Sequence, residues 1–351
     1  MPIQSRIVVQ PDRDGPLQIQ EVELPAPAPH EVLVKIRSSG VCQSQVFWMH
    51  QPRSNPVLFG HEGYGVVEAT GEAVTGVERG DHVLVTWLPR KDPDGRAPVT
   101  STVKLADGRT GVSPNVYTWA EYTLADELYV YPLPSEARLD EVAVVGCAVL
   151  TGAGSVLHSG VPLRGATAAV IGVGGVGLSA IAAAKALGAA RVFALDLVEE
   201  KLRFARAFGA TDCVDAGDGD PALLVAEGTG GGVDLVVDCV ASESSVGQAL
   251  RMARQGRLGE RPGGVVCLVG IPKKAMSIDA PAMLFGQKSL VGSLAGGCSQ
   301  ADIATFLHWH RDGTLDLERM VTDRYPFDRV TQAVDDLVAG RIRGRSILVL
   351  D

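Results

Sequence analysis

A glycine motif at Gly172, Gly174 and Gly177 constrains the fold of this chain more than any other feature of its sequence. The motif directly follows the apolar segment 166–172, which we expect to be a strand, and it opens the segment 175–187, which we expect to be a helix. In this context the glycines permit a tight turn, let the backbone approach a pyrophosphate, and bring helix and strand close together. The motif therefore predicts a dinucleotide site, with Gly175 at the start of the helix where amide groups face the phosphates.

The segments after the motif alternate between apolar runs and stretches of helix length. The apolar runs read RVFALD, CVD, DLVVDCV, VVCLVG and SLVGS. This repetition is typical of a parallel sheet with helices on both faces, and strands that are apolar throughout suit a sheet buried on both sides. We therefore expect an α/β fold with a doubly wound parallel sheet of the Rossmann type.

The predicted strand RVFALD ends at Asp196, 19 residues after Gly177. A carboxylate at this place can accept hydrogen bonds from the hydroxyls of the adenosine ribose. A 2′-phosphate would instead meet the charges of Asp196, Glu199 and Glu200. The sequence thus favours NAD over NADP.

The first 150 residues have a different pattern, in which short β-segments alternate with turns rich in proline and glycine. Helical periodicity is scarce there, so we expect a partly open antiparallel β-barrel. The expected domains are 1–150 for the barrel, 151–293 for the Rossmann domain, and 294–351 for a return to the barrel domain. The polar stretch 89–116 is expected to be a loop or lobe.

Four residues of the barrel region carry the chemistry of a metal site. Cys42 lies in GVCQSQ, His61 and Glu62 in a glycine-dense turn, and Cys147 in an apolar run. Taken singly, such residues are more often core cysteines and hydrogen-bonded turn histidines. Together, two thiolates, an imidazole and an adjacent carboxylate suit a catalytic Zn²⁺ with one open position.

The same residues carry a resemblance to a known family. The pattern G-H-E-x-x-G-x5-G-x-x-V is met by Gly60, His61, Glu62, Gly65, Gly71 and Val74. With this pattern, the chain resembles the zinc-containing medium-chain alcohol dehydrogenases over essentially its whole length. The resemblance implies a GroES-like barrel domain into which the Rossmann domain is inserted. It also implies reversible hydride transfer between NAD⁺ and a primary or secondary alcohol.

The resemblance assigns roles to individual residues. It makes Cys42, His61 and Cys147 ligands of the catalytic zinc, with Glu62 beside the metal or as a transient ligand. It gives Ser44 the hydroxyl that touches the substrate oxygen and passes its proton on. The cofactor positions that it implies are Thr151 and Val176 at the nicotinamide, Arg345 at the pyrophosphate, and the backbones of Val269, Ser293 and Ala295 at the carboxamide.

The chain departs from the family pattern in three ways. Residues 89–116 contain no cysteine, so we expect no structural zinc and one zinc per subunit. Gln43 and Gln45 stand where many relatives carry a basic residue and an aspartate, and Phe47 stands where some carry a relay histidine. These departures keep open a related function, reduction of a conjugated C=C or imine bond. A non-enzymatic NAD-binding protein is the more distant alternative.

The net charge and the cysteines of the chain indicate which partners and which cellular location to expect. Asp and Glu number 41 against 32 Lys and Arg, a net charge of −9, which argues against nucleic acid as a partner. The uncharged run 165–184 contains five glycines, so a strand, a turn and a buried helix explain it better than a membrane span. With no secretory signal and six scattered cysteines, we expect a cytoplasmic protein. The resemblance implies a homodimer or homotetramer acting on a small-molecule alcohol, aldehyde or ketone.

Overall fold

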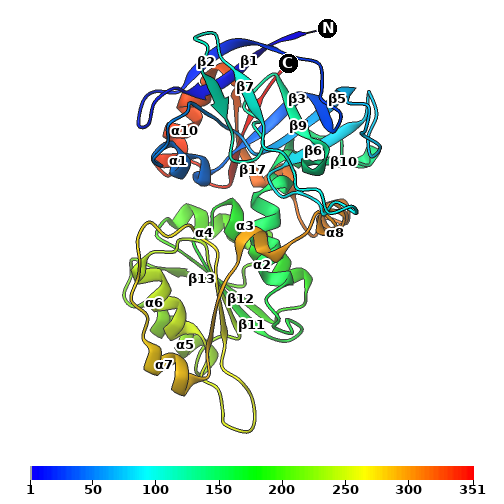
Figure 1. Ribbon diagram of the computed structural model, residues 1–351. Coiled ribbons are helices and arrows are strands. Elements are labelled where there is room, and N and C mark those ends of the chain that lie inside the picture. The colour runs from blue at the N-terminus through cyan, green and yellow to red at the C-terminus, as the bar shows by residue number, and fades with distance from the viewer. Residues whose placement is uncertain (1) are drawn as a thin grey trace. The chain divides into compact units, whose positions relative to one another are not determined.

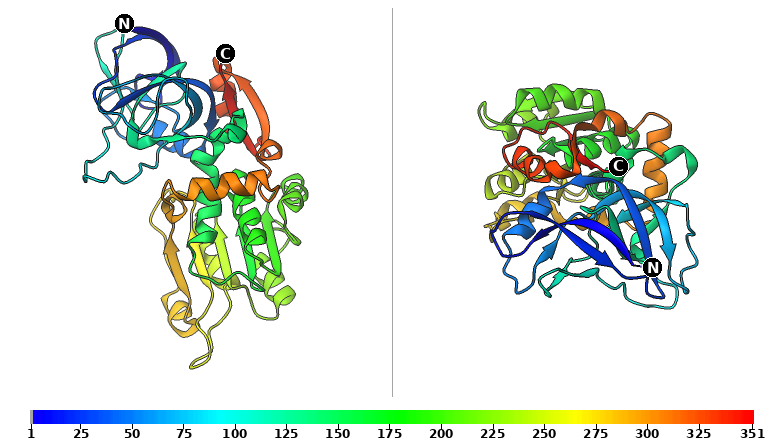
Figure 2. Two further views of the ribbon diagram at one scale, coloured as in Figure 1. Left: turned by 90° about the vertical axis from the view of Figure 1, so that its right-hand side faces the viewer. Right: turned by 90° about the horizontal axis from the view of Figure 1, so that it is seen from above.

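The computed structural model describes residues 2–351, which divide into two compact units. Unit 1 comprises the chain up to Cys147 together with Leu317–Asp351, and unit 2 comprises Ala148–Asp316. The ribbon diagrams show unit 1 built mainly from strands and unit 2 from a sheet flanked by helices (Figures 1 and 2). The predicted α/β architecture, a Rossmann sheet inserted in a GroES-like barrel domain, is confirmed.

Unit 1 contains two sheets that are mostly antiparallel. One has the strand order β2-β1-β4-β8-β7, and the other has the order β10-β6-β5-β3-β18-β17, with β9 also paired to β3. The strands are β1 (Ile3–Gln10), β2 (Gln18–Leu24), β3 (Glu31–Val41), β4 (Val57–Leu58), β5 (Glu62–Thr70), β6 (His82–Thr86), β7 (Thr102–Lys104), β8 (Thr110–Val112), β9 (Tyr122–Asp126), β10 (Val130–Pro132), β17 (Val321–Pro326) and β18 (Arg345–Val349). The helices are α1 (Gln43–Met49), α9 (Leu317–Met320) and α10 (Val330–Val338), with the 3-10 helices η1 (Glu127–Tyr129), η2 (Ser135–Ala137), η3 (Asp140–Gly146) and η6 (Phe327–Arg329).

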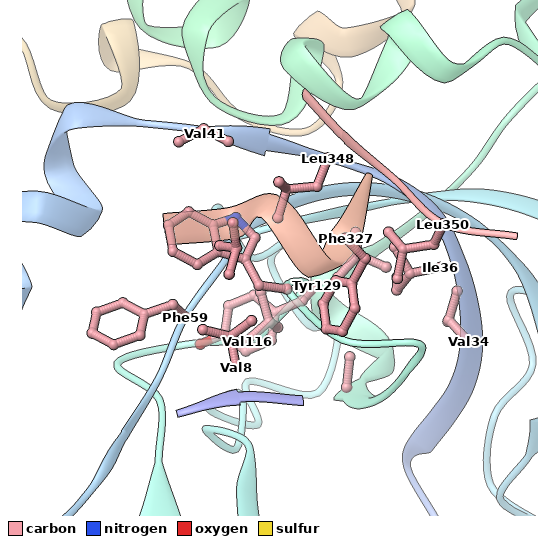
Figure 3. Packing of buried hydrophobic residues seen from close by; sticks show 14 of the residues in the cluster. Val8, Val34, Ile36, Val41, Phe59, Val116, Tyr129, Phe327, Leu348 and Leu350 are labelled. Carbon is pink, nitrogen blue, oxygen red and sulfur yellow. The ribbon is translucent and has the colours of Figure 1, made fainter. Parts of the chain in front are cut away.

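The main core of unit 1 is formed by residues from both ends of the chain. Alternate residues of β3, among them Val34 and Ile36, point into it with Phe59 (Figure 3). Phe327 and Leu348 from the C-terminal return pack in the same cluster. Because β18 pairs with β3, the final strand is an integral part of the barrel sheet, as the sequence predicts.

Unit 2 contains a six-stranded sheet in which every pair is parallel. Its order is β13-β12-β11-β14-β15-β16, so the chain reverses direction across the sheet between β11 and β14, the arrangement of dinucleotide-binding folds. The strands are β11 (Thr167–Ile171), β12 (Arg191–Asp196), β13 (Asp212–Asp215), β14 (Leu235–Asp238), β15 (Val265–Leu268) and β16 (Ser289–Gly292). The helices are α2 (Ala148–Leu157), α3 (Gly175–Ala186), α4 (Glu199–Ala205), α5 (Pro221–Thr229), α6 (Glu243–Met252), α7 (Ala280–Gly286) and α8 (Asp302–Arg311), with η4 (Arg206–Phe208) and η5 (Leu294–Gly297).

The structure corrects the second predicted domain boundary. The return to unit 1 begins at Leu317, whereas the sequence places it at residue 294. Segment 294–316 stays with unit 2 because α8 buries Ile303, Phe306 and Leu307 and lies against α2. The first boundary falls at Cys147, close to the predicted residue 150.

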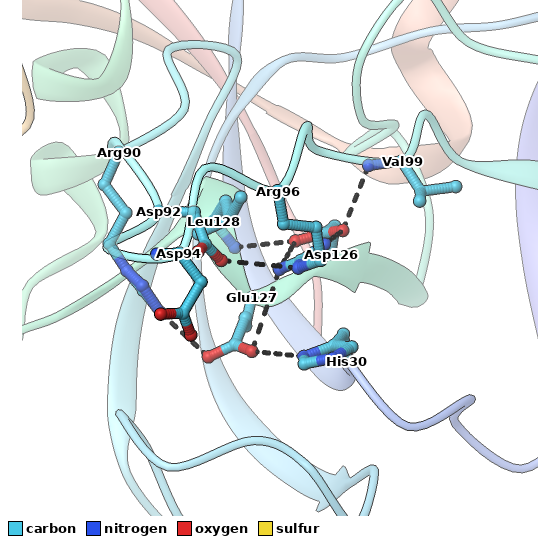
Figure 4. A network of polar contacts seen from close by, with 9 residues as sticks. All are labelled: His30, Arg90, Asp92, Asp94, Arg96, Val99, Asp126, Glu127 and Leu128. Carbon is cyan, nitrogen blue, oxygen red and sulfur yellow. Dashed lines mark hydrogen bonds and ion pairs between the residues drawn. The ribbon is translucent and has the colours of Figure 1, made fainter.

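The polar stretch 89–116 is only partly a loop, because β7 and β8 pair within it as a short hairpin. Its remainder is held by ion pairs to the strand end at Asp126 and Glu127 (Figure 4). Both oxygens of Asp126 accept hydrogen bonds from Arg96, at 2.5 and 3.0 Å. Arg90 and His30 both pair with Glu127, each at 2.8 Å. We call residues 89–116 the polar lobe.

No single helix among the described residues is long and apolar enough to cross a membrane. The bent pair of η3 and α2 meets the requirements of length and composition only when the two are taken together.

Candidate active site

Two paired strands and a 3-10 helix bring the predicted metal ligands of unit 1 together. Cys42 follows the end of β3 and is the N-cap of α1, while His61 directly precedes β5. Because β3 pairs with β5 in antiparallel fashion, the end of one strand lies beside the start of the other. Cys147 ends η3, which packs on both strands. Ligand atoms of Cys42, His61, Glu62 and Cys147 all lie within 4.8 Å of one another.

The geometry of this cluster fits a tetrahedral zinc ion. The sulfur atoms of Cys42 and Cys147 are 3.8 Å apart. Two thiolates on one tetrahedral Zn²⁺, each about 2.3 Å from the metal, stand about 3.8 Å apart. The Nε2 atom of His61 is buried and has no hydrogen-bond partner among the described residues. A buried nitrogen beside two thiols has a ready explanation as a metal ligand.

The pKa values of the two thiols are shifted in opposite directions. The hydrogen bond from Cys147 lowers the pKa of Cys42 well below its ordinary value, against the opposing effect of burial, and His61 and Arg345 act in the same direction. The same hydrogen bond raises the pKa of Cys147, to which burial adds. The lowered pKa of Cys42 favours its thiolate form, which is the form that binds a divalent metal.

Glu62 is held beside the cluster by an ion pair with Arg345, and both side chains are buried. Burial alone would lower the pKa of Arg345, but Glu62 and the Cys42 thiolate together raise it above its ordinary value. Arg345 is the first residue of β18, next to the end of β3 in the sheet. The sequence predicts that Arg345 reaches the pyrophosphate, whereas the structure pairs its guanidinium with Glu62. A pyrophosphate contact stays a prediction.

Ser44 and Gln45 on the first turn of α1 contact the ligands from one side. The hydroxyl of Ser44 donates a hydrogen bond to the sulfur of Cys42 at 3.2 Å. The Gln45 oxygen accepts from the backbone N–H of Gly60 at 2.6 Å, and its amide nitrogen lies 2.5 Å from Nδ1 of His61. Because the Gly60 N–H can only donate, the amide oxygen must face it, which leaves the amide nitrogen to donate to His61.

The glycine loop of unit 2 has the geometry of a phosphate site. Gly172 adopts a φ of +83°, which a side chain would disfavour. A Cβ atom on Gly177 would lie 2.1 Å from the carbonyl oxygen of Gly172, so only glycine allows α3 to pack so close to β11. A Cβ atom on Gly174 would meet nothing within 4 Å, so open space borders the N-terminus of α3. This space fits a pyrophosphate, for which NAD is the predicted carrier.

Asp196 lies beside this loop at the end of β12. One carboxylate oxygen accepts from the backbone N–H of Val173 at 2.9 Å, and the other accepts from Val198 at 3.1 Å. These bonds orient the carboxylate toward the loop, and each oxygen keeps a further lone pair for a hydroxyl.

Two of the other predicted cofactor residues of unit 2 directly follow strands of its sheet. Val269 follows β15, and Ser293 follows β16, where its hydroxyl lies 2.9 Å from that of Ser155. Ala295 adopts a φ of +52°, which is uncommon for a residue with a side chain. Thr151 on α2 and Val176 on α3 belong to helices that pack tightly, since a Cβ atom on Gly152 would lie 2.0 Å from the Val176 oxygen.

Two features of the site escape prediction from the sequence. A Cβ atom on Gly40 would lie 2.4 Å from the Glu62 carboxyl carbon, so this glycine makes room for Glu62. In the sequence, Gly40 is marked only by its position two residues before Cys42. The partner of Glu62 is likewise unpredicted, because Arg345 is 283 residues away and reaches it only through the pairing of β18 with β3.

Comparison with known proteins agrees with this arrangement. A family model described as "Zinc-binding dehydrogenase" matches residues 175–311, and one described as "Alcohol dehydrogenase GroES-like domain" matches residues 28–135. Alcohol dehydrogenase class-P of Arabidopsis thaliana is 30% identical, over 96% of this chain and 95% of the relative. The chain belongs to the zinc-dependent medium-chain dehydrogenase/reductase family. Membership makes it an oxidoreductase acting on CH–OH groups.

Further members of this family are similar over their full length. Alcohol dehydrogenase class-3 of Caenorhabditis elegans is 31% identical, over 96% of this chain and 94% of the relative. Among solved structures, an alcohol dehydrogenase zinc-binding domain protein from Burkholderia ambifaria has a TM-score of 0.89 at 28% identity, covering 100% of both chains. Benzyl alcohol dehydrogenase from Acinetobacter calcoaceticus has a TM-score of 0.88 at 25% identity, covering 99% of this chain and 100% of that structure.

Proposed function

We propose that this family member is a zinc-dependent alcohol dehydrogenase that transfers a hydride reversibly between a primary or secondary alcohol and NAD⁺. The observation that carries the proposal is the buried cluster of Cys42, His61 and Cys147, with the Ser44 hydroxyl bonded to one of its sulfurs. A Zn²⁺ ion held there supplies Lewis acidity that lowers the pKa of an alcohol hydroxyl. NAD⁺ supplies the hydride acceptor.

The side chains of unit 1 then have distinct tasks. Cys42, His61 and Cys147 hold the ion, and Glu62 stands beside them as a neighbour or transient ligand. Ser44 receives the alcohol proton, because it is the hydroxyl next to the ligand Cys42 on the first turn of α1. Trp87, whose ring centre lies 6.3 Å from that of His61, offers an apolar surface for the carbon chain of the alcohol.

The proposed cofactor is NAD. Asp196 is oriented by two backbone N–H groups and can accept hydrogen bonds from the ribose hydroxyls. A 2′-phosphate would be repelled by this carboxylate. Gly172, Gly174, Gly175 and Gly177 would cradle the pyrophosphate, and Thr151, Val176, Val269, Ser293 and Ala295 would contact the nicotinamide end.

We further propose one tightly held zinc per subunit and no structural zinc. In place of thiolates, the polar lobe has the ion pairs from Arg90 and Arg96. The assembly is proposed to be a homodimer or homotetramer formed through β16. This strand is at the edge of the sheet, and Leu284 and Phe285 next to it in sequence are 72% and 83% exposed. A cytoplasmic location is supported by six cysteines that are all free.

A substrate panel tests the proposal. NADH formation is followed with primary, secondary and aromatic alcohols, before and after removal of metal with a chelator and after return of Zn²⁺. We expect oxidation of at least one class of alcohol, loss on chelation, and recovery with Zn²⁺. Reduction of a conjugated C=C or imine bond without any alcohol oxidation would establish the alternative enzyme. NADH binding with no turnover of any substrate would indicate a non-enzymatic protein.

A further inference from the structure

A second group of potential metal ligands lies within unit 2, apart from the proposed catalytic cluster. His158 follows α2, Cys298 follows η5, and Asp302 is the first residue of α8. One ligand atom from each side chain lies within 4.8 Å of the other two. Helices α2 and α8 lie side by side in Figures 1 and 2. His158 and Asp302 are therefore held at the ends of two rigid helices.

We propose that His158, Cys298 and Asp302 form a second site for a divalent metal ion, with Zn²⁺ the best match. An imidazole nitrogen, a thiolate and a carboxylate oxygen are the three ligand types that zinc accepts, and no hard cation such as Mg²⁺ favours a thiolate. The site goes beyond the proposed dehydrogenase activity, which requires only the metal held by Cys42, His61 and Cys147.

The ligands are partly arranged before a metal binds. The Nε2 atom of His158 lies 3.3 Å from one oxygen of Asp302. The other oxygen of Asp302 accepts hydrogen bonds from the backbone N–H of Ser299 at 2.8 Å and from its hydroxyl at 3.2 Å. Outer hydrogen bonds of this kind fix the direction of a ligating carboxylate.

The thiol of Cys298 lies against α2 at a position that a side chain on the helix would block. A Cβ atom on Gly154 would lie 2.2 Å from the sulfur of Cys298, so α2 carries a glycine at the point where the thiol lies against it. The thiol donates one hydrogen bond, of 3.5 Å, to the carbonyl oxygen of Leu150. Because a thiol is a weak hydrogen-bond donor, this contact can be exchanged for a metal–sulfur bond.

The exposure of these ligands to solvent determines the affinity for zinc that we expect at the second site. The side chains of His158 and Asp302 are 40% and 18% exposed, so a fourth coordination position opens to water. Three ligands at such a site should bind more weakly than the fully buried catalytic cluster. Dialysis should therefore empty this site and leave the catalytic zinc in place.

Zinc titration of the full chain tests the proposal. Dialysed protein, its remaining zinc measured by elemental analysis, is titrated with Zn²⁺ against a chromophoric chelator. We expect one additional equivalent with a micromolar Kd, and at least about tenfold weaker binding for Cys298→Ser and for His158→Asn, about 1.4 kcal/mol. Cys213→Ser, which changes a partly buried thiol elsewhere in unit 2, should bind like the unchanged protein.

Cobalt provides a second readout of the ligands themselves. Co²⁺ added to the dialysed protein should produce a thiolate-to-metal charge-transfer band that Cys298→Ser lacks and Cys213→Ser retains. His158→Asn changes a half-exposed side chain at a helix end, so it keeps the test valid if Cys298→Ser fails to fold. Absence of additional zinc up to about 100 µM, or undiminished binding by Cys298→Ser or by His158→Asn, would overturn the proposal.

Discussion

Ser44 is expected to take part in proton transfer at the proposed catalytic site without binding the metal. Its hydroxyl bonds to a ligand sulfur but supplies no ligand itself. We expect Ser44→Ala to lower kcat by about 10²–10⁴, the usual contribution of a positioned acid or base, with zinc content unchanged. Steady-state kinetics with elemental analysis measures both, and Ser44→Thr, which restores a hydroxyl, should recover much of the rate. Wild-type alcohol oxidation by Ser44→Ala would contradict this role.

Asp196 is expected to determine the choice of cofactor. The unchanged protein should prefer NAD⁺ over NADP⁺ by at least about tenfold in kcat/KM, about 1.4 kcal/mol. Asp196→Ala should weaken the use of NAD⁺ and bring the preference close to unity, because it removes both the ribose acceptor and the repulsion of a 2′-phosphate. Asp215→Ala, at the end of the neighbouring strand β13, is the matched control and should leave the preference unchanged. Equal use of both cofactors by the unchanged protein would refute the assignment.

Gln45 is expected to limit the affinity of His61 for zinc. Its amide nitrogen donates to Nδ1, which places the imidazole proton on Nε2, the nitrogen that faces no other partner. In Gln45→Asp, a carboxylate can accept from both Gly60 and His61 and so frees Nε2 for the metal. We expect about tenfold tighter zinc binding, measured by competition with a chelator. Gln43→Asp adds the same charge on an exposed side chain and should have little effect.

At the scale of elements, the polar lobe depends on the ionised form of Asp126. Burial would raise the pKa of Asp126, but the hydrogen bonds from Arg96, Leu128 and Val99 outweigh it and lower the pKa below its ordinary value. A lowered pKa in the folded state contributes stability above the unfolded value, near pH 4. That contribution is lost as the pH falls through the folded-state value.

Replacement of this carboxylate should therefore destabilise the lobe at neutral pH. We expect Asp126→Asn to lower the free energy of unfolding by about 2–3 kcal/mol, with a difference from the unchanged protein that shrinks below about pH 4. Denaturant unfolding at several pH values measures this. Asp94→Asn, an exposed aspartate of the same lobe, is the control and should change stability little. An equal loss for both variants would show that the network does not hold the lobe.

The elements also show how much of the fold and of the site can be predicted from the sequence. The strand and helix around Gly172 were predictable because the glycine spacing and the apolar runs are local patterns. Segment 294–316 was misassigned because its attachment to unit 2 depends on Phe306 packing in the interior, which no local pattern reports. The strands β7 and β8 have three residues each, too few for alternation to appear. The contact of Arg345 with Glu62 depends on the pairing register of distant strands.

At the scale of the whole molecule, the exposed edge of unit 2 predicts self-association. Phe285 on α7 shortly precedes β16 in sequence and is 83% exposed, and large exposed apolar side chains of this kind commonly mark interfaces. We expect Phe285→Asp to shift a dimer or tetramer toward smaller species in light scattering. Leu223→Asp, which places the same charge on an exposed leucine of α5, should leave the mass unchanged. A monomeric unchanged protein would contradict the proposed assembly.

The ion pairs of the polar lobe have a practical consequence for work with this enzyme. Residues 89–116 contain no cysteine, so the lobe offers no thiol for an oxidant to cross-link and no thiolate to hold a zinc ion. Metal replacement at Cys42 and Cys147 should then leave the lobe folded. In the Cys298→Ser variant, which removes the proposed second site, cycles of stripping and reloading with spectroscopic metals should then report on the reactive centre and not on loss of a distant scaffold.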